Sequence, residues 1–497
     1  FPVTISSDVL PEFREYERTL AAVANAYVQP AMAEYLDRLE QELADRLPGV
    51  RLAVVRSDGG LMSPGDASSR PVETVFSGPA GGVRASVHLG ELVGVRRVLS
   101  FDMGGTSTDV ALSRDGQAAV ARTSSLTEYF RVRVPSLDVI SIGAGGGSIA
   151  HVPMTGALRV GPESAGSSPG PACYGRGGTD VTVTDANVVL GYLPSLLGGR
   201  MPLHRDRALE SLSALGEALG AGPEDAARAV ITIANEKMLS GLRLVSLQRG
   251  HDPREFALVA FGGAGPLHAN ALMDLIGSQL CVIPPAPGVF STYGFLIADV
   301  QREFARSCIR RVSKLEASAV AAVIDELATR GASWLEREGF EPSERRLEWS
   351  FGMRYHRQGY ELPVHHPDPA GDPDLLQTLA QGFVAAHRQT YGFDLDIEVE
   401  LVVARCIAIG ITPTPLTMPA ARGAGGVEEA LVEAGHTIYW QGEWVEAPRY
   451  DRRRLAPGHD LIGPCVIEQE DSTTLVHPQT HVSVDGFRNL LMERVAA

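Results

Sequence analysis

The segment Arg97–Gly116 constrains the fold more than any other part of the chain. It contains an apolar strand, an acid, two glycines, two hydroxyl residues, a second acid and another strand that ends in a turn. Gly104 and Gly105 let the backbone bend tightly between neighbouring strands and leave its N–H groups open to an anion. A plain β-hairpin is the alternative, but it does not need two acids that bracket Gly-Gly-Thr-Ser. We therefore predict a hairpin that binds the phosphates of a nucleotide.

The polar side chains of this hairpin have distinct expected roles. Asp102, at the end of the first strand, is the expected ligand of a hydrated Mg²⁺ that accompanies the phosphates, because this ion prefers oxygen ligands. The hydroxyls of Thr106 and Ser107 are expected to donate hydrogen bonds to phosphate oxygens. Asp109 is expected to orient an attacking water or a substrate group. Asp102, Asp109 and Thr106 are therefore the candidate catalytic residues.

A second glycine loop lies in the segment Arg254–Asn270, where a strand runs into glycines and then into a helix. Gly262, Gly263 and Gly265 leave the backbone free of side chains, so that a flat base or a sugar can approach closely. The N-terminus of the following helix favours negative charge. A strand-to-helix turn in any parallel sheet is the alternative. Paired with the first loop, this one is predicted to hold the adenosine side of a nucleotide.

Two other glycine-rich runs, Gly78–Gly82 and Gly143–Ser148, are expected to be flexible loops. They could line the cleft beside the nucleotide, or they could only allow loops to pack tightly against a sheet. Four residues of metal-binding types lie in or near the second run: Asp138, His151, Cys173 and Asp185. Their spacing matches no compact zinc pattern, so hydrogen bonding within turns is the favoured interpretation.

The pattern along the chain predicts two parts. Apolar residues at helical spacing predict a long amphipathic helix from Glu12 to Leu47. Strand and helix signals then alternate to about Ile297, which is typical of an α/β fold. After Gln301 come a charged helix near 314–338, a helix near 373–390 and several strand-like runs. We place a boundary near residue 300, between an α/β part (1–300) and a mixed, β-rich part (301–497).

Charge and composition exclude several classes of protein. The 44 Lys and Arg residues against 60 Asp and Glu residues leave a net charge of −16, so a nucleic-acid partner is not expected. The five scattered cysteines suit neither a disulfide framework nor a thiolate zinc site. No apolar run approaches the roughly 20 residues that cross a bilayer. We expect a cytoplasmic protein that does not bind membranes.

The two glycine loops, in this order, resemble the second phosphate motif and the adenosine motif of the actin, sugar-kinase and heat-shock-chaperone ATPase superfamily. Further stretches resemble the hydantoinase A/oxoprolinase family over essentially the whole chain. These stretches are Val75–Val83, Ile142–Ala150, Val160–Gly166, Pro169–Gly178 and Thr182–Asn187. The resemblance implies an actin-like (ribonuclease H-like) ATPase lobe with a C-terminal β-rich domain.

The resemblance also implies a function. It implies ATP-dependent phosphorylation and hydrolytic ring opening of a cyclic amide, such as hydantoin, 5-oxoproline or a lactam, with ATP and Mg²⁺ as cofactors. A hydantoinase B-type subunit is the implied partner, in a hetero-oligomer or a homodimer. The alternatives are the ATP-using subunit of an acetone- or acetophenone-type carboxylase, and a non-catalytic scaffold. Full-length members carry an earlier Asp-x-Gly-Gly-Thr motif in an N-terminal domain, which residues 1–96 do not contain, so another segment or chain is expected to supply half of the cleft.

Overall fold

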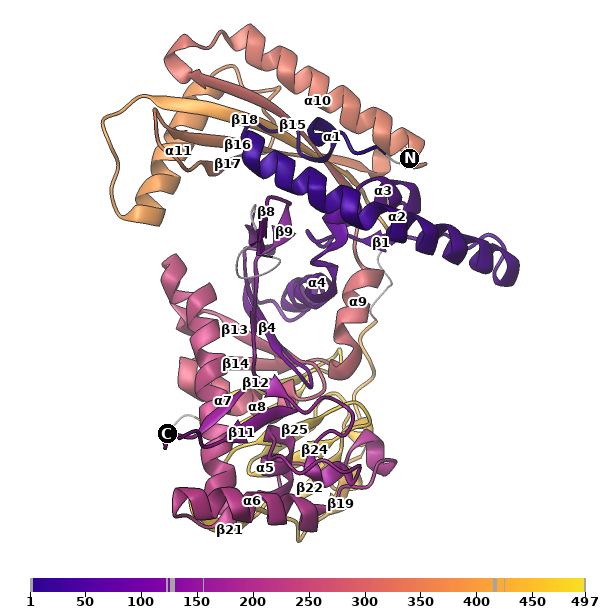
Figure 1. Cartoon of the computed structure of the whole chain (residues 1–497), viewed down its shortest axis with the longest axis vertical. Helices are drawn as coiled ribbons and strands as arrows, with labels where there is room; N and C mark the ends of the chain where they lie inside the picture. The colour runs from indigo at the N-terminus through magenta and orange to yellow at the C-terminus, as the bar shows by residue number, and fades with distance from the viewer. Residues whose placement is uncertain are drawn as a thin grey trace. The chain divides into compact units, whose positions relative to one another are not determined.

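The computed structural model describes residues 3–121, 124–125, 130–154, 156–413, 418–423 and 425–495. The chain forms two compact units that interleave along the sequence (Figure 1). Unit 1 comprises residues 1–80, 120–137 and 295–415, and unit 2 comprises residues 81–119, 138–294 and 416–497. Because neither unit is continuous in sequence, a domain boundary near residue 300 stays a prediction.

Unit 2 is built around a nine-stranded mixed sheet in the part of the chain that the structure describes. The strand that contains Asp102, β3, lies inside this sheet, antiparallel to β4 on one side and parallel to β13 on the other. In spatial order the strands are β10 (Val139–Ile142), β4 (Thr108–Arg114), β3 (Arg97–Met103), β13 (Ala257–Phe261), β14 (Leu280–Ile283), β27 (Leu490–Arg494), β26 (Thr480–Val484) and β23 (Asp460–Ile462), with β5 (Gln117–Ala118) paired to β4.

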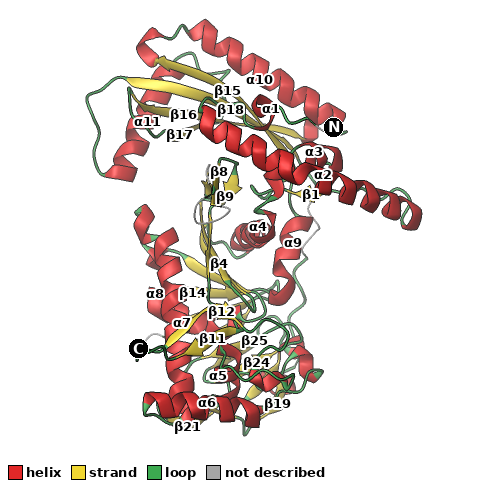
Figure 2. Ribbon diagram, viewed as in Figure 1, coloured by secondary structure: helices red, strands yellow, loops and turns green. Residues whose placement is uncertain are grey.

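Helices pack on the central strands of this sheet and close the core of unit 2. The helix α7 (Pro223–Val245) contacts β4 and β10, and α8 (Gly265–Ile276) contacts β13 and β14. The close approach of α7 needs Gly241, because a Cβ there would lie 2.0 Å from the Ile142 side chain. The remaining helices are α4 (Ser77–Leu92), α5 (Val183–Val189), α6 (Arg205–Leu219) and α9 (Phe290–Leu296), the last running into unit 1. Figure 2 shows them in red around the yellow strands.

Small sheets and hairpins complete unit 2. The strands β11 (Ser148–His151) and β12 (Arg159–Ser164) form one hairpin, and β20 (Thr437–Trp440) and β21 (Glu443–Glu446) form another. A four-stranded sheet has the order β19 (Leu431–Glu433), β22 (Arg449–Asp451), β24 (Cys465–Glu468) and β25 (Thr473–Val476). The turn between β24 and β25 becomes important at the site described below.

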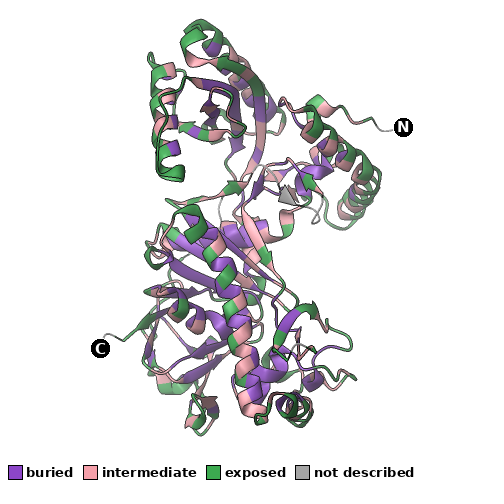
Figure 3. Cartoon of the chain, turned by 60° about the vertical axis from the view of Figure 1, so that its left-hand side comes forward, coloured by how far each residue is buried: buried purple, intermediate pink, exposed green. Residues whose placement is uncertain are grey.

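Unit 1 contains a six-stranded sheet covered by helices in the described residues. Its order is β1 (Val54–Val55), β2 (Leu61–Met62), β15 (Val300–Arg311), β18 (Val399–Gly410), β16 (Arg345–Tyr355) and β17 (Leu362–His366). The helix α10 (Ala317–Arg337) packs on β15, β18 and β16, and α11 (Leu375–Tyr391) packs on β16 and β17. Buried aromatic side chains such as Trp334, Phe351 and Phe383 fill the interface. Figure 3 shows the strands buried and the outer helix faces exposed.

Several predicted elements are confirmed. The helix near 314–338 is α10, the helix near 373–390 is α11, and the strand-like runs of the β-rich part are strands. The long N-terminal helix exists as α2 (Glu15–Arg46) and includes Pro30. Its predicted buried stripe is wrong in part, because Val23, Tyr27 and Tyr35 are exposed. None of the described helices combines the length and apolarity needed to span a bilayer.

Candidate functional site

The predicted phosphate hairpin is present as the β3–β4 pair. Asp102 pairs directly with Asp109 across the two antiparallel strands, and Met103 pairs with Thr108. A hydrogen bond from the Gly104 N–H to the Ser107 carbonyl, 3.0 Å long, closes the turn. Because residues opposite each other in an antiparallel pair point to the same face, the two carboxylates share one side of the hairpin.

Two carbonyl groups of the turn are occupied by hydrogen bonds, while three of its N–H groups are not. The carbonyls of Gly104 and Gly105 accept hydrogen bonds from the N–H groups of Gly146 and Gly147, at 3.0 and 2.6 Å. Gly105 and Thr106 are exposed, and within the described chain the N–H groups of residues 105–107 have no hydrogen-bond partner. The turn therefore has three N–H groups available to an anion, while two of its carbonyl groups are already occupied.

The glycines of the run Gly143–Ser148 allow this backbone contact. A Cβ on Gly145 would lie 2.6 Å from the carbonyl carbon of Thr106, and a Cβ on Gly147 would lie 3.0 Å from the carbonyl oxygen of Gly105. Residues 144–148 are buried, and Thr184 of α5 donates from its Oγ1 to the carbonyl of Gly146 at 2.8 Å. This run thus packs against the predicted phosphate turn, as the packing interpretation expects.

The prediction of a flexible loop at Gly78–Gly82 is wrong, because these residues lie in the helix α4. The reason is close helix packing. A Cβ on Gly82 would lie 2.5 Å from the Phe261 ring, and the carbonyl of Gly81 lies where Gly294 of α9 would need a side chain. The cost of glycine in a helix, about 1 kcal/mol relative to alanine, is offset by this packing.

Asp102 and Asp109 form a partly buried acidic pair. Burial, together with the neighbouring Asp109 carboxylate, raises the pKa of Asp102 to about 6. Burial also raises the pKa of Asp109. Ser291 donates to Asp102 at 3.3 Å, and Ser141 donates to Asp109. In the described residues neither carboxylate has a cationic side-chain partner, so a cation that binds here relieves their repulsion.

The second glycine loop lies directly beside Asp102. The strand β13 is parallel to β3 with Phe261 in register with Asp102, so both strands end at the same edge of the sheet. Gly262 has φ of +82°, and a Cβ there would lie 2.4 Å from both the Asp102 Oδ1 and the Met103 carbonyl oxygen. Gly263 is exposed, and Gly265 begins α8. The structure therefore brings the two predicted glycine motifs together at one edge.

Asp471 was not among the residues predicted for the site. The turn between β24 and β25 places this residue beside the second glycine loop. Its Oδ2 accepts a hydrogen bond from the Gly288 N–H at 2.8 Å, and its carbonyl oxygen lies 3.7 Å from the Cβ position of Gly263. The carbonyl of Pro287, next to Gly288, accepts from the Gly262 N–H. No sequence pattern links Asp471 to Gly263, which lie about 200 residues apart. Their proximity is therefore seen only in the folded structure.

Two of the four scattered residues considered as metal ligands, Asp138 and Asp185, have other partners. Asp138 forms an ion pair with Arg249. The buried carboxylate of Asp185 accepts hydrogen bonds from the N–H groups of Ala172, Cys173 and Thr182, and from the Thr182 hydroxyl. Within the described ranges, no cluster of three or more His, Cys, Asp or Glu side chains is arranged to hold a metal ion. Hydrogen bonding is therefore the correct interpretation for Asp185.

Comparison with known proteins now decides the family. The family model described as hydantoinase/oxoprolinase matches residues 18–304, and the model for the hydantoinase/oxoprolinase C-terminal domain matches residues 310–495. The chain belongs to the hydantoinase/oxoprolinase family. The match includes both glycine motifs of the site and the acidic turn at Asp471. The resemblance predicted from the sequence is thereby confirmed.

Individual members of the hydantoinase/oxoprolinase family resemble the chain closely. The caprolactamase alpha subunit of Pseudomonas jessenii is 35% identical over 491 residues, covering 96% of this chain and 70% of that protein. A crystal structure of the ATP-dependent caprolactamase from Pseudomonas jessenii matches with a TM-score of 0.89 and 32% identity, over 99% of this chain and 72% of that chain. A nucleotide-free structure of acetone carboxylase, an enzyme of ATP-dependent acetone carboxylation, matches with a TM-score of 0.79 and 26% identity. The match covers 99% of this chain and 71% of that chain. These matches confirm the predicted α/β, actin-like ATPase fold.

Proposed function

We propose that this chain binds ATP with Mg²⁺ at the β3–β4 hairpin and uses the terminal phosphoryl group to activate a cyclic amide for hydrolytic ring opening. One observation carries the proposal: within the described chain the N–H groups of residues 105–107 have no hydrogen-bond partner, and they stand beside two carboxylates without a cationic partner. N–H groups that can bind an anion, next to two carboxylates that can bind a cation, suit a nucleotide that is bound together with a divalent cation. The ATP-dependent caprolactamase supports the choice of reaction.

Each residue of the site has a role in this proposal. The N–H groups of Gly105, Thr106 and Ser107, with the two hydroxyls, bind phosphate oxygens. Asp102 is the proposed ligand of Mg²⁺, which supplies positive charge against the phosphates when bound. Asp109, oriented by the Ser141 hydroxyl, positions the nucleophile.

The adenosine side is assigned to the loop of Gly262, Gly263 and Gly265. The free backbone at Gly263 lets a base or a sugar approach, while Asp471 fixes the neighbouring turn through Gly288. The N-terminus of α8 favours negative charge near this loop. These assignments make the edge formed by β3 and β13 the nucleotide-binding edge of the sheet.

The chemistry explains why ATP is needed. Resonance makes an amide carbonyl a poor electrophile. Transfer of the terminal phosphoryl group to the amide oxygen, with ADP as the leaving group, weakens that resonance and creates a good leaving group. Water can then add to the carbon, and the ring C–N bond breaks as the amine leaves with a proton, which gives an acyl phosphate. A second water cleaves this acyl phosphate to the carboxylate and inorganic phosphate. In this proposal a hydantoinase B-type subunit completes the reaction with this chain.

Phosphorylation of a ketone for carboxylation is the second candidate function. The match to acetone carboxylase over 99% of this chain favours it. The site places no residue that separates an amide oxygen from a ketone oxygen, so the assay must include both substrates. Because the reaction uses ATP and all five cysteines are free thiols, we propose a cytoplasmic location.

The Asp102→Asn variant tests the proposal. Isothermal titration calorimetry with a non-hydrolysable ATP analogue and Mg²⁺ is expected to show at least a tenfold loss of affinity, or about 1.4 kcal/mol, because the amide cannot replace an anionic ligand. Asp115→Asn, at the exposed far end of the same hairpin, is the matched control and is expected to bind normally. Equal affinity in both variants contradicts the assignment.

Turnover separates the candidate reactions. Phosphate release is measured with the complete protein and its B-type partner, with hydantoin, 5-oxoproline or caprolactam as substrate, and separately with acetone and bicarbonate. Release that depends on a cyclic amide supports the first candidate. Release that depends on acetone and bicarbonate supports the second and excludes the first.

A further inference from the structure

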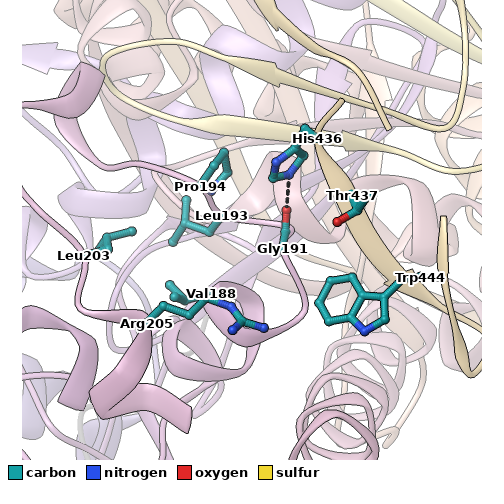
Figure 4. Close-up of a pocket in the computed structure, with 9 residues that line it drawn as sticks. All are labelled: Val188, Gly191, Leu193, Pro194, Leu203, Arg205, His436, Thr437 and Trp444. Carbon is teal, nitrogen blue, oxygen red and sulfur yellow. Dashed lines mark hydrogen bonds between the residues drawn. The ribbon is translucent and has the colours of Figure 1, made fainter. Parts of the chain in front are cut away.

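A pocket of about 390 Å³ lies in unit 2 and shares no residue with the nucleotide site (Figure 4). One wall is apolar and is formed by Val188 at the end of α5 and by Leu193 and Leu203. The opposite side is formed by the β20–β21 hairpin, which contributes the indole of Trp444. Ligand pockets have volumes of about 300–1,000 Å³, so this one suits a molecule of about one ring.

A single cation is exposed within this pocket. Arg205, the first residue of α6, has its guanidinium carbon 5.7 Å from the centre of the Trp444 ring. Its Nη2 donates to the carbonyl of Val189 at 3.1 Å, which fixes the side chain. Among the described residues it has no carboxylate partner. Since a guanidinium has five N–H donors, several stay free for an incoming anion.

The polar edge of the pocket is also held in place. The imidazole of His436 makes a 2.8 Å hydrogen bond from Nε2 to the carbonyl of Gly191. Thr437, the next residue, presents its hydroxyl on the same side of the pocket in Figure 4. An apolar wall, an aromatic face and a guanidinium without a carboxylate partner among the described residues form a combination that selects one kind of ligand.

We propose that this pocket binds a small carboxylate with a compact apolar body. The carboxylate pairs with the Arg205 guanidinium, because these two groups form strong charge-assisted hydrogen bonds. The apolar body lies against Leu193 and Leu203 and packs over the Trp444 indole. The proposal goes beyond the proposed function and does not depend on it, because no residue of the hairpin site takes part.

Benzoate is the probe for this proposal. Titration calorimetry of the complete protein is expected to give a dissociation constant on the order of 1 mM, which is ordinary for a ligand of this size. Benzyl alcohol, which has the same ring without the charge, is expected to bind at least about tenfold more weakly. Absence of benzoate binding, or equal binding of both molecules, overturns the proposal.

Two variants locate the binding. Arg205→Gln is expected to weaken benzoate at least about tenfold, whereas Arg207→Gln, two residues along the same helix and exposed, is expected to bind as the unmodified protein does. Trp444→Leu is expected to weaken benzoate by about threefold to tenfold through loss of the aromatic face. Thermal melting confirms that each variant is folded. Undiminished binding in a folded Arg205→Gln variant overturns the proposal.

Discussion

At the scale of single residues, Asp102 and Asp109 occupy an unfavourable position in the absence of a ligand. Their carboxylates face each other across β3 and β4, partly buried, with only serine hydroxyls as hydrogen-bond donors among the described contacts. Such strain is common at functional sites, where a bound partner relieves it. Without nucleotide, this pair is therefore expected to lower the free energy of unfolding of the protein.

The pH dependence of stability tests this expectation. Because the pKa of Asp102 rises from its ordinary 3.8 to about 6 in the folded state, the protonated form stabilises the fold below about pH 4. This stabilisation is lost as the pH rises to about 6. Asp102→Asn, which cannot ionise, is therefore expected to be more stable than the unmodified protein above pH 6, by at most about 3 kcal/mol. Thermal unfolding between pH 4.5 and 8, without nucleotide or Mg²⁺, measures the difference.

The difference between the two proteins should grow from pH 4.5 to about 6 and then stay level. Asp115→Asn serves as the control and should show no such growth. A difference that is constant across this range, or an Asp102→Asn variant that is less stable at pH 8, would show that the ionised Asp102 carboxylate does not destabilise the folded protein.

At the scale of elements, the turn from β13 to α8 is the most restrictive part of the site. Gly262→Ala is expected to disrupt the site, because alanine is strained at φ of +82° and its Cβ would meet Asp102 and the Met103 carbonyl at 2.4 Å. The expected result is a loss of stability of about 2 kcal/mol or more and weaker binding of the ATP analogue. Thermal melting and calorimetry measure both effects.

Gly263→Ala is the matched control for that change. Its Cβ would meet only the Asp471 carbonyl, at an ordinary 3.7 Å, so stability is expected to change by less than about 1 kcal/mol. If both variants lose the same stability, steric crowding at Gly262 is not the cause.

The elements also show how much the sequence can predict. Strong periodicity and turn residues predicted α10, α11 and the strands of the hairpin, since local patterns determine them. The two glycine motifs were predicted to hold the phosphate and adenosine sides of one nucleotide, and the parallel pairing of β3 with β13 places both at one edge of the sheet. The helix α4 was not predicted, because its glycines serve a contact with α9 that is more than 200 residues away in sequence. Asp471 was missed for the same reason.

At the scale of the whole molecule, every candidate residue of the nucleotide site belongs to unit 2. This unit is assembled from three separate stretches of the chain, so no continuous segment contains the site. Hydrogen–deuterium exchange is expected to show that an ATP analogue with Mg²⁺ protects peptides around residues 98–110, 143–148, 260–266 and 285–291. Slower exchange follows from the reduced local opening of segments that bind a ligand.

Peptides of unit 1, such as those in α10 and α11, provide the internal comparison. Their protection is expected to change less than that of the four site segments. Protection that is as large in α10 as at residues 98–110 would argue against a site confined to unit 2.

The buried helix α5 contacts both the run Gly143–Ser148, which packs against the turn at Gly104–Ser107, and the pocket that contains Arg205. Its Thr184 holds the backbone behind the phosphate turn, and its last turn supplies Val188 and the carbonyl that anchors Arg205. Seven helical residues span only about 10 Å, and all seven are buried, so the helix has little freedom to deform. A carboxylate that displaces the end of α5 would thereby alter ATP affinity, and thermodynamic reciprocity would require ATP to alter carboxylate affinity by the same factor.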